Sequence, residues 1–137
     1  MALRFLVDTS VIKRLAQPAV RQVVEPLAEA GELARARITD LEVGYSARNA
    51  AEWDTLMTAL EIFKPVDTTD AHHRRALQVQ RLLAQRIQCG RKIPDLLIAA
   101  AAEDHGLTVL HYDTDFDQIS AATGQPSQWV VPAGTAD

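Results

Sequence analysis

Four acidic residues stand where segments that we expect to form strands give way to helices. Asp8 directly follows an apolar segment at the start of the chain, and Asp113 follows another near its end. Glu42 and Asp95 lie in the first turns of two expected helices, Glu42 soon after a second apolar segment and Asp95 beside Pro94. Parallel strands have their carboxyl ends at one edge of the sheet, so all four acids would project from that edge.

Four acids at one sheet edge repel one another strongly, and a shared divalent cation is the usual way to relieve that repulsion. Oxygen ligands without cysteine or histidine favour Mg²⁺ or Mn²⁺ over zinc. An ion held in this way indicates a phosphate substrate, because it polarises a phosphoryl oxygen, lowers the pKa of a bound water and neutralises the leaving oxygen. The sequence leaves open whether one ion or two are held.

Each acid also has an ordinary structural explanation. Asp8 can cap a helix or form a turn. Glu42 can bond back to the backbone of Thr39, since Thr39 is a good N-cap and the two residues match the capping-box pattern. Asp95 can simply favour the positive end of a helix dipole, and Asp113 can begin an Asx-turn. Taken singly these explanations are adequate, but four acids at one edge favour the metal site.

The elements expected to position these acids alternate between strands and helices. Apolar runs and their flanking residues predict strands at 2–7, 33–38, 61–66, 107–111 and 129–131. Helical spacing predicts helices at 10–15, 19–30, 39–49, 53–60, from 70 to a stop at Gly90, 95–105 and 113–122. This alternation is typical of an α/β fold, a parallel sheet covered by helices on both faces. The length of 137 residues fits one domain.

Charge and cysteine content narrow the class of protein. All 14 Lys and Arg residues lie at or before Lys92, and seven of the 18 acids lie after it, so residues 1–92 carry +3 (14 − 11) and residues 93–137 carry −7 (0 − 7). The net charge of −4 argues weakly against a nucleic-acid binder, but the acids are concentrated where the candidate site needs them. The single cysteine, Cys89, excludes an internal disulfide and a cysteine-based zinc site, which favours the cytoplasm. No apolar run is long enough to span a bilayer.

Four motifs in order resemble the PIN-domain family, and within it the VapC-type toxins of bacterial toxin–antitoxin pairs. They are Phe5-Leu6-Val7-Asp8-Thr9-Ser10, Thr39-Asp40-Leu41-Glu42-Val43-Gly44-Tyr45-Ser46-Ala47-Arg48, Ile93-Pro94-Asp95-Leu96-Leu97-Ile98-Ala99-Ala100 and Asp113-Thr114-Asp115-Phe116. The resemblance covers nearly the whole chain, so we expect residues 1–137 to form a single PIN domain. It implies a three-layer α/β/α sandwich with a central parallel sheet.

The same resemblance implies an endoribonuclease that uses Mg²⁺ or Mn²⁺ to hydrolyse RNA. It carries Asp8, Glu42, Asp95 and Asp113 over as the acidic cluster. Asp115 resembles a further ligand or a neighbouring acid, although Asp117 can take that place instead. Thr9 or Ser10 resembles the small hydroxyl that hydrogen-bonds the cluster.

The resemblance also implies partners. It suggests a homodimer and a cognate VapB-type antitoxin, together a heterotetramer or larger assembly. In such pairs the C-terminal segment of the antitoxin wraps the toxin and commonly places a basic side chain in the acidic site. The expected groove for that segment lies among the helices of residues 10–60.

Basic residues flank the acidic motifs and are candidates for binding RNA phosphates. They are Lys13, Arg14, Arg48, Arg91 and Lys92. Each such contact adds to the salt dependence of RNA binding. The ordinary alternative for each is a solvated surface charge. The four histidines show no spacing typical of shared metal ligands, and we expect His111 to be a packed histidine.

Two other functions fit part of the pattern. A phosphotransfer enzyme with Asp8 as its nucleophile, like a haloacid-dehalogenase phosphatase, needs a second aspartate two residues later, where this chain has Ser10. A non-catalytic binding module on the same fold is the other alternative, and the intact set of acids argues against it.

Overall fold

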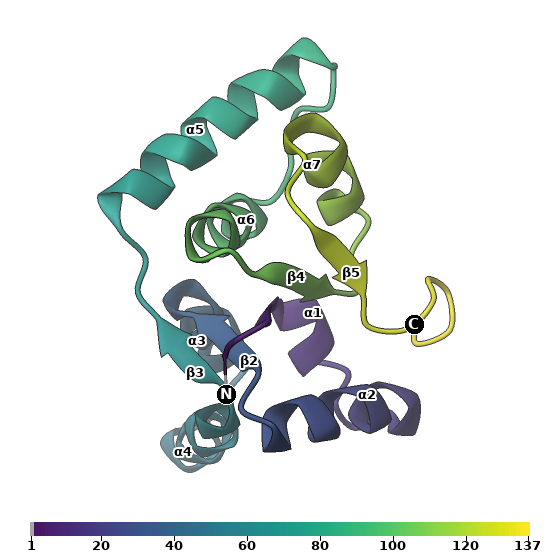
Figure 1. The fold of residues 1–137 in the computed structure, drawn as a ribbon. Helices are drawn as coiled ribbons and strands as arrows, with labels where there is room; N and C mark the ends of the chain where they lie inside the picture. The colour runs from purple at the N-terminus through teal and green to yellow at the C-terminus, as the bar shows by residue number, and fades with distance from the viewer. Residues whose placement is uncertain (1) are drawn as a thin grey trace.

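A computed structural model describes residues 2–137 of the protein. Its centre is a five-stranded sheet of β1 (Phe5–Val7), β2 (Leu33–Ala36), β3 (Lys64–Val66), β4 (Thr108–His111) and β5 (Ser127–Trp129). The strand order is β3-β2-β1-β4-β5, and every neighbouring pair is parallel (Figure 1). All five carboxyl ends therefore lie at one edge, as the alternating pattern predicted.

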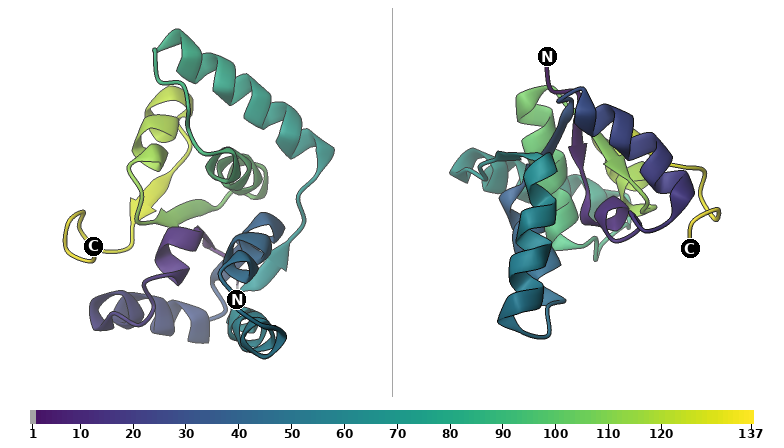
Figure 2. Two further views of the ribbon diagram at one scale, coloured as in Figure 1. Left: turned by 180° about the vertical axis from the view of Figure 1, so that it is seen from behind. Right: turned by 90° about the horizontal axis from the view of Figure 1, so that it is seen from below.

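Helices cover both faces of this sheet, which confirms the predicted three-layer α/β/α sandwich. They are α1 (Thr9–Ile12), α2 (Pro18–Glu29), α3 (Arg37–Tyr45), α4 (Ala50–Ala59), the 3₁₀ turn η1 (Leu60–Ile62), α5 (Asp70–Gln85), α6 (Ile93–His105) and α7 (Asp115–Thr123). In Figure 1, α5, α6 and α7 lie on one side of the sheet and α1 and α2 on the other. The reverse view in Figure 2 shows the same separation.

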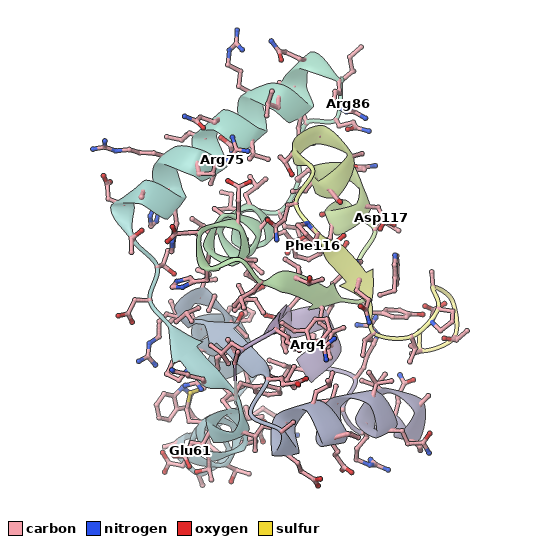
Figure 3. The ribbon with its side chains drawn as sticks, viewed as in Figure 1. Arg4, Glu61, Arg75, Arg86, Phe116 and Asp117 are labelled. Atoms are coloured by element: carbon pink, nitrogen blue, oxygen red, sulfur yellow. The ribbon has the colours of Figure 1, made fainter. Side chains whose placement is uncertain are left out.

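Each face of the sheet carries its own apolar core, because successive side chains of a strand point to opposite faces. Leu6 of β1 packs into the core with α5, α6 and α7, whereas Phe5 and Val7 pack into the core with α1 and α2. Phe116 of α7 lies in the first of these layers, between its helix and the sheet (Figure 3). Since β1 is buried on both faces, it is the central strand that fixes where Asp8 emerges.

The expected N-cap at Thr39 is wrong. Helix α3 begins at Arg37 with Ala36 as its N-cap, because β2 runs into the helix without a connecting loop. Thr39 therefore lies inside the first turn and is fully buried. The carboxylate of Glu42 bonds the hydroxyl of Thr9 rather than closing a capping box on Thr39.

Several other boundaries differ from the sequence prediction. Helix α3 ends at Tyr45 rather than at Asn49, and β3 begins at Lys64 because residues 60–62 form η1. Helix α4 begins earlier than expected because the Asn49 side chain accepts from the Glu52 amide at 2.8 Å. Strand β5 ends at Trp129, where we expected it to begin. Helix α5 ends at Gln85, and Ile87 lies beyond it in the left-handed region at φ 56°. A Schellman motif causes this end, with the Gln88 amide bonding the Leu83 carbonyl at 2.8 Å.

Among residues 2–137, no helix combines the length and the apolar character needed to cross a bilayer.

Candidate active site

Three aspartates from separate segments meet at the carboxyl edge of the sheet. Asp8 follows β1, Asp113 follows β4, and Asp95 lies in the first turn of α6. One carboxylate oxygen of each lies within 4.8 Å of the others. Asp8 and Asp95 are each only 3% exposed. They open into a pocket of about 260 Å³ that Glu42 also lines.

Local hydrogen bonds fix Asp8 at this edge. Its amide donates to the Leu110 carbonyl at 2.9 Å, which continues the pairing of β1 with β4. Its Oδ2 accepts from the Ser10 amide at 3.0 Å and so caps α1. The Ser10 hydroxyl in turn accepts from the Tyr112 amide at 2.9 Å, which ties α1 to the end of β4. Asp8 is thus a helix cap and a member of the acidic cluster at the same time.

Glu42 is held one helical turn into α3 by the hydroxyl of Thr9. Thr9 Oγ1 donates to Glu42 Oε1 at 2.8 Å, and Thr9 is itself buried. This bond occupies one carboxylate oxygen and leaves Oε2 for other partners. The two hydroxyls that follow Asp8 therefore act differently: Thr9 orients an acid, and Ser10 joins two backbone segments.

The acids are held together at an electrostatic cost. Burial, with the charges of Asp8 and Asp113, raises the pKa of Asp95 to about 8. Burial also raises the pKa of Asp8 above its ordinary value, with a contribution from the charges of Glu42 and Asp113, although bonds from Ser10 oppose it. Burial acts to raise the pKa of Asp113 as well, but the hydrogen bonds from Lys92 and the Asp115 amide, with the charge of Lys92, together outweigh burial, and that pKa lies below its ordinary value.

The residue set fits a hard divalent cation. Asp8 Oδ1 and Asp95 Oδ2 are buried and have no hydrogen-bond partner among the described residues. Buried acceptors of this kind are rare unless another group satisfies them. All the converging ligands are carboxylate oxygens, which suit Mg²⁺ or Mn²⁺.

Lys92 and Arg91 pair with acids at or beside the cluster. The Lys92 ammonium donates to Asp113 and lies 3.8 Å from both Asp95 and Asp115. Burial alone would lower the pKa of Lys92, but its bond to Asp113 and the neighbouring acids raise it above its ordinary value. Arg91 pairs with Asp115 at 2.9 Å. The cluster is therefore partly neutralised from its rim by the segment that leads into α6.

Comparison with known proteins agrees with this fold and site. The family model described as "PIN domain" matches residues 5–122. This chain belongs to the PIN-domain family. "Ribonuclease VapC51" of Mycobacterium tuberculosis is 71% identical over 137 residues, covering all of both chains. "Ribonuclease VapC21" of the same species is 48% identical over 99% of this chain and 100% of the relative.

The solved structures support the same fold. A DNA-bound VapBC complex from Salmonella typhimurium contains a chain that matches with a TM-score of 0.75 at 19% identity. That match covers 94% of this chain and 99% of the other. The PIN domain described here therefore has the architecture of a chain that was crystallised in a toxin–antitoxin complex.

Asp115 and Asp117 are placed differently in the PIN domain. The amide of Asp115 donates to Asp113 Oδ1 at 2.9 Å, and its carboxylate pairs with Arg91. Asp117 instead accepts from the indole nitrogen of Trp129 at 3.1 Å, on the outer side of α7 (Figure 3). Asp115 thus neighbours the cluster without joining the three converging carboxylates, and Asp117 is engaged with β5.

The candidate RNA-binding residues fall into those that line the acidic pocket and those that do not. Lys13, Arg14 and Lys92 line the acidic pocket. Arg48 does not line it and instead pairs with Glu52 at 3.0 Å on the surface of α4. The geometry therefore favours the first three as contacts to a bound phosphate.

Sequence reasoning did not assign a role to Tyr112, which lines the pocket. Its neighbour His111 is fully buried, as expected of a packed histidine, between the rings of Phe116 and Trp129 at 5.0 Å from each. His111 Nδ1 accepts from the Asp113 amide at 3.1 Å, so this histidine helps to fix the loop that presents Asp113. Burial lowers the pKa of His111 to about 4, which keeps the ring neutral. The sequence signal that could have identified Tyr112 and His111 was their place at the carboxyl end of β4, next to Asp113.

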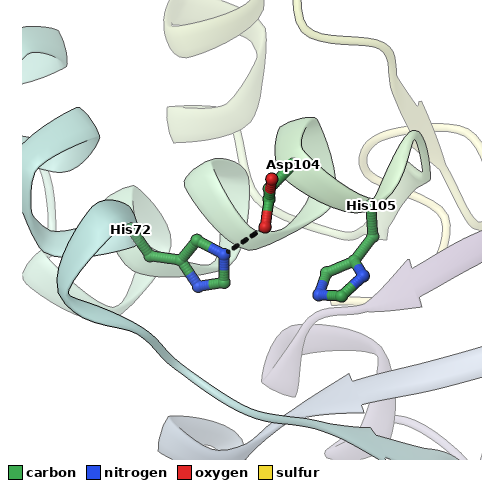
Figure 4. Close-up of side chains that lie close together, drawn as sticks. All are labelled: His72, Asp104 and His105. Atoms are coloured by element: carbon green, nitrogen blue, oxygen red, sulfur yellow. Dashed lines mark hydrogen bonds and ion pairs between the residues drawn. The ribbon is translucent and has the colours of Figure 1, made fainter.

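A second group of possible metal ligands lies away from this site, where α5 begins and α6 ends. His72, Asp104 and His105 come together there, although their sequence spacing gave no sign of it (Figure 4). His72 Nε2 bonds Asp104 at 2.9 Å, and its Nδ1 accepts from the Thr69 amide at 3.2 Å. An accepting Nδ1 leaves the proton on Nε2, where a metal would need a lone pair. We therefore interpret this group as a structural tie between two helices.

Proposed function

We propose that the protein is a divalent-metal-dependent endoribonuclease and the toxin of a toxin–antitoxin pair. The observation that carries the proposal is the convergence of Asp8, Asp95 and Asp113, two of them with a buried oxygen that no described residue satisfies. Mycobacterial relatives that match over the full chain are named ribonucleases. The reaction is the hydrolysis of an RNA phosphodiester bond.

The unpartnered oxygens of Asp8 and Asp95, with the carboxylate of Asp113, would hold Mg²⁺ or Mn²⁺. When bound, such an ion supplies Lewis-acid polarisation of the phosphate and a water of lowered pKa. Glu42 keeps one carboxylate oxygen beyond its bond to Thr9, and we assign it to accepting the proton of the attacking water. Lys92 offers an ammonium that the substrate phosphate can take over from Asp113.

We also propose the partners that this class of protein implies. An exposed apolar strip on α3 and α4 contains Leu41, Tyr45 and Trp53, which are 73%, 93% and 47% exposed. Such a strip needs a covering partner, and a VapB-type antitoxin segment that wraps α1 to α4 fits this need. We further propose that the chain forms a homodimer, that residues 1–137 make a single PIN domain, and that the protein acts in the cytoplasm.

The test is cleavage of a structured RNA pool by purified protein with Mg²⁺, Mn²⁺ or EDTA. Asp8→Asn is the informative variant because asparagine still caps α1 but loses the anionic ligand. We expect it to lower cleavage by more than about 100-fold, exceeding the loss typical of outer residues at metal sites. Asp54→Asn, at an exposed aspartate of α4 outside the pocket, is the matched control.

Two results would contradict the proposal. Cleavage by Asp8→Asn at the wild-type rate in a nuclease-free preparation would exclude Asp8 from the chemistry. A wild type that neither cuts RNA nor binds Mn²⁺ in calorimetry would instead indicate a binding module that has kept the PIN fold.

A further inference from the structure

The segment that follows β5 returns to the wall of the acidic pocket. A turn closes it, with the Thr135 amide bonding the Pro132 carbonyl at 3.1 Å and Gly134 in the left-handed region at φ 84°. This turn directs Ala136 back to the segment that follows α1, where it is 2% exposed. We call residues 132–137 the tail. Figure 1 shows it beyond β5, past the edge of the sheet.

The tail bonds two side chains that line the pocket. The Ala136 carbonyl accepts from Arg14 Nε at 2.9 Å and from Gln17 at 3.0 Å. The Ala136 amide donates to the Tyr112 hydroxyl at 2.9 Å, and that hydroxyl donates to the Asp137 carboxylate at 2.8 Å. The amide and the carbonyl of Ala136 are thus both engaged by side chains of the pocket wall, Tyr112 and Arg14.

Arg14 is held rigidly by this arrangement. Its guanidinium carbon lies 4.4 Å from the centre of the Tyr112 ring, a cation–π contact. Its Nη1 donates to the Ser10 carbonyl at 2.8 Å, while its Nε donates to the tail. The side chain is therefore fixed at three points: the ring, α1 and the tail.

The charge of Arg14 nevertheless remains uncompensated. Within residues 2–137 it forms no ion pair, although Asp8, Asp95 and Asp113 line the same pocket. Its hydrogen bonds go to main-chain carbonyls, which leave its full positive charge in place. Lys92 differs, because it faces three of the acids. A fixed, unpaired guanidinium at the wall of a phosphate-cleaving site is suited to binding an anion.

We propose that the tail positions Arg14 to bind an RNA phosphate next to the scissile one. This inference rests on the proposed ribonuclease function and names a substrate contact of the same site. Arg14 touches the RNA, and Tyr112 and Ala136 are positioning residues that act through it. A guanidinium fixed before the RNA arrives loses less rotamer freedom on binding, so the tail increases affinity for RNA.

Binding of a fluorescent single-stranded RNA by anisotropy, in EDTA and over a range of salt concentrations, tests the proposal without any cleavage step. Arg14→Met is expected to weaken binding about tenfold and to reduce the salt slope by about 0.7, the value for one phosphate on a single strand. Arg14→Lys keeps the charge and the salt slope but lacks the planar guanidinium that can bond a phosphate with two nitrogens. It is expected to recover part of the affinity that Arg14→Met loses.

Tyr112→Phe tests the role of the tail without removing the charge of Arg14. It keeps the ring beneath Arg14 and removes the hydroxyl that holds Ala136 and Asp137. We expect faster hydrogen exchange at the Ala136 amide and a roughly threefold loss of RNA affinity at unchanged salt slope.

Arg21→Lys is the matched control for the Arg14 variants. Arg21 also bonds main-chain carbonyls but lies outside the pocket, so this variant is expected to bind RNA as the wild type does.

The results distinguish three claims: the phosphate contact of Arg14, the positioning role of the tail and the proposed ribonuclease function. An unchanged salt slope in Arg14→Met overturns the phosphate contact. Rapid exchange at Ala136 in Tyr112→Phe with wild-type RNA affinity overturns the positioning role of the tail. If the wild type cuts RNA while these variants bind it normally, this inference alone is wrong. If the wild type neither binds nor cuts RNA, the proposed function fails and this inference with it.

Discussion

In the metal-free protein, the proton on Asp95 makes stability depend on pH in an unusual direction. Burial and the charges of Asp8 and Asp113 raise the pKa of Asp95 from 3.8 to about 8. Between those values the folded state holds one proton more than the unfolded chain. Stability is therefore fully present at low pH and is lost as the pH rises toward 8. Most proteins with paired carboxylates behave in the opposite way on the acid side.

His111 opposes this trend over part of the range. Its pKa falls from 6.5 to about 4, so between those values the unfolded chain binds the extra proton and stability rises with pH. The two residues approximately cancel below pH 6.5. Above it the contribution of Asp95 from pH 6.5 to 8 is about 1.5 kcal/mol, given about 1.4 kcal/mol per unit far below the pKa and half that at the pKa. The pKa of Asp8 is also raised by burial, so Asp8 acts in the same direction as Asp95.

Thermal unfolding in EDTA at pH 6.5 and pH 8 measures this loss. For a chain of this size we expect the midpoint to fall by about 5 °C. Asp95→Asn removes the Asp95 proton and is expected to show a clearly smaller fall. Because Mn²⁺ displaces the same proton, its apparent affinity in calorimetry is expected to rise toward tenfold per pH unit below 8. A midpoint that rises from pH 6.5 to 8, or Mn²⁺ affinity independent of pH, would refute this reasoning.

Three further predictions concern the framework. Arg35→Met removes a buried guanidinium that bonds Asp40 at 2.7 Å and two main-chain carbonyls, and is expected to cost about 3 kcal/mol in urea unfolding. Gly44→Ala places a Cβ 2.8 Å from the indole nitrogen of Trp53, so tryptophan fluorescence should report a displaced ring and a loss of about 1–2 kcal/mol. His72→Phe breaks the tie between α5 and α6 and is expected to cost about 2 kcal/mol while leaving Mn²⁺ stoichiometry unchanged; loss of a bound ion would contradict the assigned tautomer.

The fold and the meeting of the acids were predictable from sequence for one physical reason. Parallel strands buried on both faces produce continuous apolar runs, and the residue that follows each run must emerge at the same edge. Asp8 stands directly after β1 and Asp113 two residues after the end of β4, so their convergence follows from the pattern. Predicting the position of Asp95 required one further inference, that Pro94 marks the start of a helix and so places Asp95 in its first turn.

Features that depend on the exact path of the backbone were not predictable. Thr39 looks like an N-cap by residue type, but β2 turns into α3 without a loop and moves the cap to Ala36. The contact of Ala136 with Arg14 joins positions far apart in the chain and depends on the turn at Gly134. Residue type and spacing carry no information on where such a returning segment lies.

The acidic cluster explains why the chain has cations at its rim. Three buried or half-buried carboxylates cannot all ionise in so small a volume without compensation. The protein compensates in two ways, with a proton on Asp95 and with the Lys92 ammonium on Asp113. Under the proposed function, a divalent cation held by Asp8, Asp95 and Asp113 would bring the same charge as the proton and the ammonium together. Asp95 would then give up its proton, and the Lys92 ammonium would be available to a substrate phosphate.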